Sequence, residues 1–96
     1  MVTLTNITDQ ISPFKIHLMQ KYHLNYIAVF GSVSRGDNNE NSDIDVLVDF
    51  IQPIGIEFID LADELENILH NKIDLVSRNG IKPKYFEQIK NDLYYV

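Results

Sequence analysis

The fold of this chain follows from two neighbouring stretches: Gly31-Ser32-Val33-Ser34-Arg35-Gly36 and Ser42-Asp43-Ile44-Asp45-Val46-Leu47-Val48. The first follows the apolar run 26–30 directly, which predicts a tight turn at the end of a strand. Backbone N–H groups in such a turn can face phosphate oxygens, and Ser32 can add a hydroxyl. In the second stretch, strand alternation places Asp43 and Asp45 on one face, about 6–7 Å apart. Two carboxylates at this spacing can converge on hard cations, so the pattern is typical of a site for a metal-bound nucleoside triphosphate.

The two stretches resemble the nucleotidyltransferases of the DNA polymerase beta superfamily. Within it they are similar to the minimal nucleotidyltransferases, the MntA-type antitoxins found beside HEPN-domain toxins. The resemblance covers nearly the whole chain, and in Lys72-Ile73-Asp74-Leu75-Val76 it matches Asp74 to the third carboxylate of the family. The motif is specific because a Gly-Ser turn, an Arg-Gly pair and an Asp-x-Asp strand must all fall in register.

Length and composition narrow the class of protein. The 96 residues predict a single domain over 1–96, and the formal net charge of −6 disfavours direct binding of nucleic acid. Without cysteine there are no disulfides and no thiolate chemistry. The first residues lack the features of a signal peptide, and no apolar run approaches membrane length, so a cytoplasmic location is expected.

The apolar spacing predicts helices on both sides of a small sheet. A first helix is expected with the apolar face Ile7, Ile11, Phe14, Leu18 and Tyr22. Either Ser12 is the N-cap of a helix with Pro13 at its first position, or Pro13 bends one continuous helix; the family pattern favours one bent helix. Strands are expected over 26–30, 44–50 and 73–76, a second long helix from Ile56 to about His70, and a last helix from Pro83. The expected class is therefore α/β (α+β), a mixed sheet of about three strands flanked by helices, as the polymerase-beta-like resemblance also implies.

Three aspartates are the predicted catalytic and metal-binding residues: Asp43, Asp45 and Asp74. As ordinary strand-end acids they would need no partner, but Asp45 and Asp74 lie inside apolar runs, where an unpaired charge is costly. The resemblance implies two magnesium ions at these residues and ATP as substrate. For the phosphates we expect Gly31, Ser32, Ser34 and Arg35, although Arg35 can instead pair with Asp37 or Glu40.

Other polar clusters are set aside. Asp37, Asn39 and Asn41 occupy calcium-loop positions, but Ser42 and Val48 stand where that loop needs glycine and glutamate. The three histidines share no metal-ligand spacing, so a surface or helix-end role is expected for them. The pair Tyr94-Tyr95 is either a core edge or part of a partner surface.

The function that the resemblance implies is that of a magnesium-dependent enzyme which transfers AMP from ATP to a tyrosine of a HEPN ribonuclease toxin and so silences it. The expected partner is this toxin, in a hetero-oligomer. One alternative is transfer to a small molecule such as an aminoglycoside, although those enzymes usually carry extra helical structure. The other is an antitoxin that neutralises its toxin by docking alone.

Overall fold

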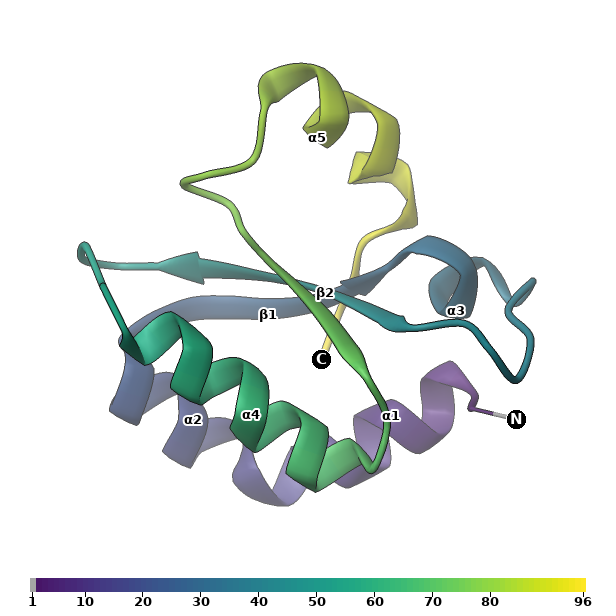
Figure 1. Cartoon of the computed structure of the whole chain (residues 1–96), viewed down its shortest axis with the longest axis horizontal. Helices are drawn as coiled ribbons and strands as arrows, with labels where there is room; N and C mark the ends of the chain where they lie inside the picture. The colour runs from purple at the N-terminus through teal and green to yellow at the C-terminus, as the bar shows by residue number, and fades with distance from the viewer. Residues whose placement is uncertain (1) are drawn as a thin grey trace.

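The computed structural model describes residues 2–96 (Figure 1). In chain order the elements are α1 (Leu4–Ile11), η1 (Ser12–Phe14), α2 (Lys15–Tyr22), β1 (Leu24–Phe30), α3 (Gly31–Arg35), β2 (Ile44–Phe50), α4 (Glu57–Leu69), β3 (Ile73–Ser77), α5 (Pro83–Ile89), η2 (Lys90–Asp92) and β4 (Tyr94–Tyr95). The predicted class is confirmed: one mixed sheet is flanked by helices.

The sheet has the strand order β3-β2-β1-β4, with β2 inside it. β1 runs antiparallel to β2 and to β4, whereas β3 runs parallel to β2. A parallel pair needs a long crossover, and α4 supplies it between β2 and β3. This topology brings the start of β2, the end of β1 and the start of β3 to the same region of the sheet.

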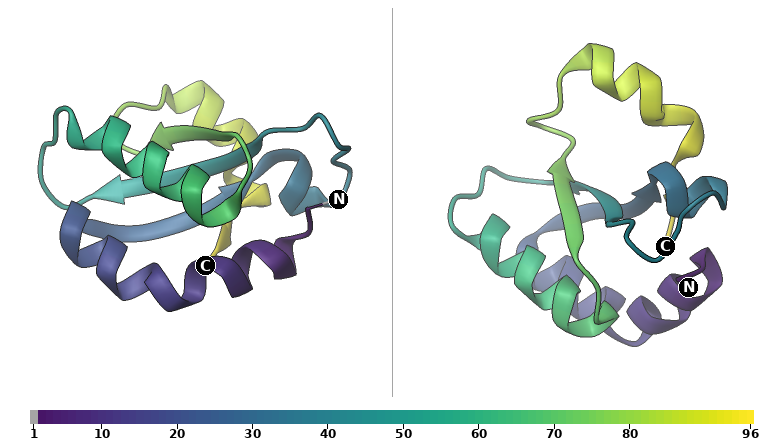
Figure 2. Two further views of the ribbon diagram at one scale, coloured as in Figure 1. Left: turned by 60° about the horizontal axis from the view of Figure 1, so that its bottom comes forward. Right: turned by 45° about the vertical axis from the view of Figure 1, so that its right-hand side comes forward.

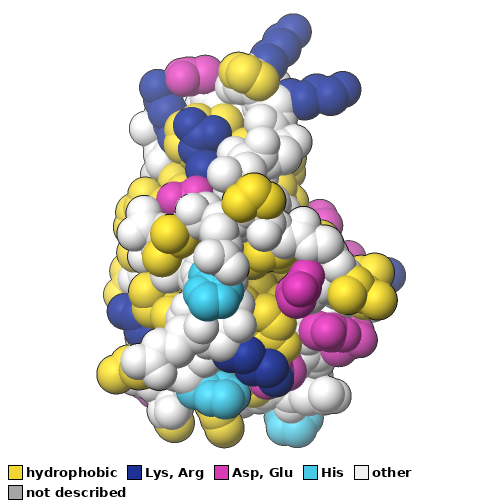
Figure 3. Space-filling view, turned by 90° about the vertical axis from the view of Figure 1, so that its left-hand side faces the viewer, with side chains coloured by type: hydrophobic (Ala, Val, Ile, Leu, Met, Phe, Trp, Pro, Cys, Tyr) yellow, Lys and Arg dark blue, Asp and Glu magenta, His cyan; other side chains and the backbone are white. Residues whose placement is uncertain are grey.

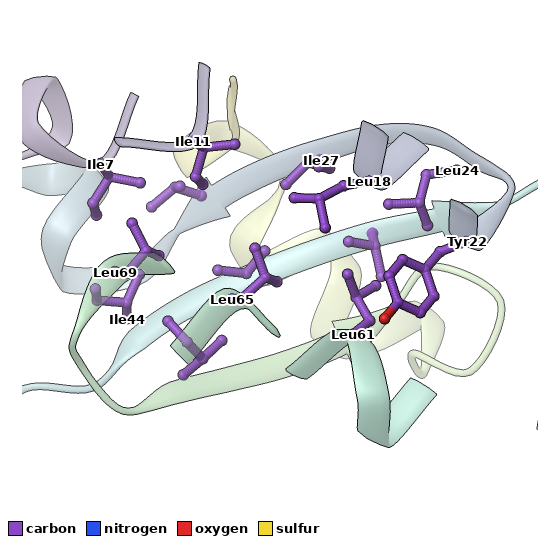
Figure 4. Close-up of a cluster of buried hydrophobic side chains, with 14 of the residues drawn as sticks. Ile7, Ile11, Leu18, Tyr22, Leu24, Ile27, Ile44, Leu61, Leu65 and Leu69 are labelled. Atoms are coloured by element: carbon purple, nitrogen blue, oxygen red, sulfur yellow. The ribbon is translucent and has the colours of Figure 1, made fainter. Parts of the chain in front are cut away.

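One face of the sheet carries the main core, covered by α1, α2 and α4 (Figures 1 and 4). Each helix contributes a stripe of fully buried aliphatic side chains, among them Ile7, Leu18 and Leu65, each with 0% of its surface exposed. Burying such a side chain contributes about 1.5–3 kcal/mol to folding. The stripe on α4 is the predicted one, with Leu61, Leu65 and Leu69 facing inward.

The opposite face, here called the α5 face, is covered only by α5 and the segments around it (Figure 2). Its buried cluster is smaller and consists of Phe30, Leu47, Ile81 and Ile89. β2 serves both cores because its side chains alternate: Val46 and Val48 join the main core and Leu47 joins the smaller one.

The prediction that Phe14 belongs to the buried face of the first helix is wrong. Phe14 is 45% exposed, and it ends the 3-10 turn that Pro13 creates between α1 and α2. Three residues per turn instead of 3.6 shift the following side chains around the axis, so Phe14 rotates off the buried stripe. Ser12 has helical backbone angles (φ −48°, ψ −46°) and not the extended ones of an N-cap residue, in agreement with one bent helix.

The C-terminus adds a strand that was not predicted from the sequence. Tyr94 and Tyr95 form β4 beside β1, and the Tyr95 ring lies edge-on to Tyr26 with 5.1 Å between the ring centroids. A two-residue strand is too short for a periodic signal, so only its long-range pairing reveals it. Tyr94 is 46% and Tyr95 58% exposed, so the pair lies at the edge of the sheet and not in the buried core.

The surface carries several exposed apolar side chains, including Ile51, Ile56 and Ile59 after β2. Figure 3 shows one side of the molecule, where hydrophobic side chains alternate with charged and histidine side chains. His23 and His70 end α2 and α4 in the left-handed conformation, with φ of 55° and 52°, which confirms a helix-end role for both. No helix within residues 2–96 is long and apolar enough to cross a bilayer.

Candidate functional site

Three side chains form a row across the α5 face, one from each of three adjacent strands. Phe30 of β1 is the cross-strand partner of Asp45 in β2, and Asp45 is the register partner of Asp74 in β3. Side chains at register positions point to the same face, so the two carboxyl groups lie side by side next to a buried aromatic ring. The structure thus brings together two predicted acids that are 29 positions apart.

The Gly31 turn closes directly over this row. Gly31 is buried and has φ +76°, a left-handed conformation that glycine adopts without strain. A Cβ atom at this position would overlap Oδ2 of Asp45 and lie 3.1 Å from its Cγ. Glycine is therefore favoured here by the backbone angle, and any larger residue would displace the Asp45 carboxylate.

The environment of Asp45 disfavours its charge. Burial is the main cause that raises the pKa of Asp45 to about 6. The negative charge of Asp74, a hydrogen bond with Asp74 and the negative charge of Asp43 raise this pKa further. Arg35 acts in the opposite direction. Among the described residues, no lysine or arginine forms an ion pair with any of the three aspartates. A cation bound between the carboxylates would supply the missing positive charge.

Asp43 lies just before β2 and is exposed, and the backbone after it is fixed by a hydrogen bond from Ile44 N–H to the Lys72 carbonyl (3.0 Å). Within residues 2–96, no three carboxylate or imidazole groups already converge as a complete metal-binding cluster. Magnesium is commonly held by one or two carboxylates together with substrate phosphates and waters, so the all-oxygen pair Asp45 and Asp74, with Asp43 beside it, fits this ion.

The short helix α3 carries the other predicted residues. Ser32 lies in its first turn, half-buried, and Gly36 ends it with φ +82°, the turn role expected for this glycine. Ser34 donates a hydrogen bond to the carbonyl of Asp92. Arg35 pairs with Asp37 (Nε to Oδ2, 3.0 Å) and with Asp92 (Nη1 to Oδ2, 2.9 Å), so the pairing with Asp37 is seen and Asp92 is an additional partner.

Tyr85, in the first turn of α5, is a neighbour of the site that was not predicted from the sequence. Its ring packs edge-on to Phe30, with 6.4 Å between the ring centroids and 78° between the planes. Burial raises the pKa of Tyr85, and the charges of Asp45 and Asp74 raise it further. Spacing along the last helix predicts the apolar face Phe86, Ile89 and Leu93, so no local signal points to Tyr85.

A tight glycine turn against paired acids, at one end of a mixed sheet, defines a nucleotidyltransferase-type site. Residues 15–93 match the family described as "Polymerase beta, Nucleotidyltransferase". The chain belongs to this family, and the resemblance seen in the sequence is confirmed.

Curated relatives match over their full length. The chain is 41% identical over 98 residues to a protein of Methanocaldococcus jannaschii that is provisionally named a protein adenylyltransferase, covering 100% of both chains. It is 35% identical over 97 residues to "Protein adenylyltransferase MntA" of Thermococcus cleftensis, covering 100% of this chain and 98% of the relative. The chain is accordingly an enzyme of the nucleotidyltransferase class.

Solved structures share the fold. A protein provisionally described as a minimal nucleotidyltransferase superposes with a TM-score of 0.83 at 28% identity, covering 99% of this chain and 97% of the other. A chain of a toxin-antitoxin crystal structure with AMP-PNP superposes with a TM-score of 0.73 at 28% identity, covering 91% and 69%.

Proposed function

We propose that this chain is a magnesium-dependent protein adenylyltransferase that transfers AMP from ATP to a tyrosine hydroxyl of a HEPN-class toxin and thereby acts as its antitoxin. The observation that carries the proposal is the pairing of Asp45 with Asp74 under the Gly31 turn. This pairing puts oxygen ligands next to a turn that accepts no side chain. Relatives named protein adenylyltransferase, and a toxin-antitoxin neighbour solved with AMP-PNP, support both the reaction and the kind of partner.

In this proposal Asp43, Asp45 and Asp74 would hold two magnesium ions. When bound, the ions lower the pKa of the acceptor hydroxyl and neutralise charge on the leaving pyrophosphate. Asp45 is central because it neighbours the other two: Asp43 stands two positions before it, just ahead of β2, and Asp74 is its register partner. Asp74 lies on the outer strand, so it is placed to take the proton of an acceptor that approaches from that side.

The phosphates are assigned to the turn after β1. Gly31 lets the backbone approach them closely, and the Ser32 hydroxyl adds a donor. Ser34 and Arg35 are assigned to the same task, but both are bonded to Asp92, so Arg35 reaches a phosphate only by exchanging this carboxylate for it. Release of Arg35 on nucleotide binding is therefore part of the proposal.

In the proposed antitoxin reaction the acceptor comes from a partner molecule. Asp43 and Asp74 are both exposed, so the site is open to a protein surface that presents a hydroxyl. The net charge of −6 favours a partner with basic residues around that hydroxyl. Apolar side chains such as Ile51 and Ile56 supply additional contact area elsewhere on the chain.

The test uses the purified chain with a HEPN-class toxin, magnesium and ATP. Intact-mass analysis of the toxin should show added AMP units, and the toxin should stay inactive after the chain is removed. The double variant Asp43→Asn and Asp45→Asn should fold but leave the toxin unmodified and fail to protect cells. If this variant protects fully and the toxin gains no mass, neutralisation is by docking and the proposed function is wrong.

A further inference from the structure

Tyr85 lies over the candidate active site of its own chain. It stands in the first turn of α5, which begins at Pro83, and its ring rests edge-on against Phe30. Phe30 is the cross-strand partner of Asp45 and is only 1% exposed, so Tyr85 covers the aromatic end of the row that continues through Asp45. The Tyr85 side chain itself is 40% exposed.

The phenol of Tyr85 lies within electrostatic reach of the aspartate pair. The charges that act on it are those of Asp45 and Asp74, the two register partners. The Tyr85 ring rests at the Phe30 end of the row, on the same face of the sheet as the aspartate pair. Its phenol belongs to the same chemical class as the acceptor assigned to the toxin.

We propose that Tyr85 is itself an acceptor, so that the chain adenylylates its own Tyr85 when no partner occupies the acceptor position. This inference rests on the proposed function. The Tyr85 phenol oxygen attacks the α-phosphorus of ATP, and the bond from this phosphorus to the oxygen bridging to the β-phosphate breaks. Pyrophosphate leaves with the bond electrons, a phosphodiester links AMP to Tyr85, and the phenol proton passes to a carboxylate of the pair and then to water.

The other tyrosines are placed differently. Tyr22 is 3% exposed and hydrogen-bonded to Glu64 between α2 and α4, under the opposite face of the sheet. Tyr26 of β1 packs against Tyr95 of β4, at the edge of the sheet opposite to β3 and Asp74. Tyr94 is 46% exposed, but it pairs with Val29, whose side chain belongs to the main core, so Tyr94 faces away from the aspartates. Tyr94 is therefore a control of matched exposure.

The experiment incubates the full chain, without partner, with magnesium and ATP labelled at the α-phosphate. Trypsin cuts after Lys84 and Lys90, which leaves Tyr85 as the only tyrosine of the peptide 85–90. We expect one AMP unit on this peptide, its loss in Tyr85→Phe and in Asp45→Asn, and its retention in Tyr94→Phe. Because the acceptor is held over its own site, the rate per chain should not change when the protein is diluted.

A parallel reaction with the toxin separates the two proposals. If the toxin is modified while the chain alone gains no AMP, the inference about Tyr85 is wrong and the proposed function stands. Label that persists in Tyr85→Phe, or a rate per chain that rises with protein concentration, also overturns the inference. If neither the toxin nor the chain is modified, the proposed function fails and the inference fails with it.

Discussion

Replacing Gly31 by alanine tests whether the approach of the turn to Asp45 serves the chemistry. The added Cβ faces two obstacles: a left-handed backbone with φ +76°, and the Asp45 carboxylate, whose Oδ2 occupies the same space. Gly36→Ala is a matched control because Gly36 has φ +82° and no atom within 4 Å of the position that a Cβ would take. The two variants share the backbone strain and differ in the contact with Asp45.

The expected magnitudes follow from this difference. A non-glycine residue in the left-handed region costs roughly 1–2 kcal/mol, which lowers the unfolding temperature of a domain of this size by about 4–16 °C. Both variants should lose this much. In Gly31→Ala alone the carboxylate must also turn away, and displacement of a catalytic group by about 1 Å can reduce the rate of transfer about a hundredfold. We therefore expect similar stability losses and very different activities.

Thermal unfolding measures the first quantity, and the rate of AMP transfer to the toxin, at a temperature where both variants are folded, measures the second. Calorimetric titration with magnesium and ATP shows whether binding is lost together with transfer. If Gly31→Ala and Gly36→Ala transfer AMP at the same rate, the contact between the turn and Asp45 has no catalytic role, and the assignment of this site is wrong.

Three further predictions address charge and packing. Without metal, Asp45→Asn should be more stable than wild type at pH 7: the raised pKa of Asp45 costs stability as the pH rises from about 4 to 6, because the unfolded carboxyl ionises first. The full shift corresponds to about 3 kcal/mol, and solvent screening of this partly exposed group reduces it to about 1 kcal/mol, so unfolding curves should coincide below about pH 4. ATP binding should require magnesium, since the triphosphate would otherwise face three carboxylates; calorimetry that gives equal affinity in EDTA would refute the metal site. Tyr22→Phe should lower the free energy of unfolding by about 1–2 kcal/mol through loss of the hydroxyl bond to Glu64, with unchanged ATP affinity; unfolding curves that match wild type would show that this bond contributes nothing.

The sequence was sufficient to predict three of the four strands, because alternation is a local property, and it marked the acids within them as candidates. Asp45 and Asp74 interrupt otherwise apolar runs, where an unpaired charge is energetically costly, so both positions indicate a functional role. That Asp45 and Asp74 are register partners came only with the structure, because the resemblance grouped them without giving their pairing.

What the sequence could not predict depends on contacts between distant segments. Tyr85 joins the site only because α5 folds back over the sheet, and the bond between Arg35 and Asp92 links residues 57 positions apart. The exposure of Phe14 arises from a change of helical period after Pro13, which a constant spacing of 3.6 cannot represent. For Tyr85 and Arg35, the local sequence was compatible with more than one interaction partner.

The two faces of the sheet have different roles: one carries the main core, and the other, the α5 face, carries the candidate site. Three helices seal the main core, whereas the α5 face is covered by α5 and the segments around it, and Asp43 and Asp74 remain exposed. β2 connects the two faces, since Val46 faces the main core while Asp45, one position earlier, faces the site. The main core therefore fixes the position of Asp45, because the buried side chains of β2 hold the backbone from which Asp45 projects. Truncation of Val46 should accordingly lower stability first, whereas truncation of Asp45 should remove the proposed central ligand without opening the core.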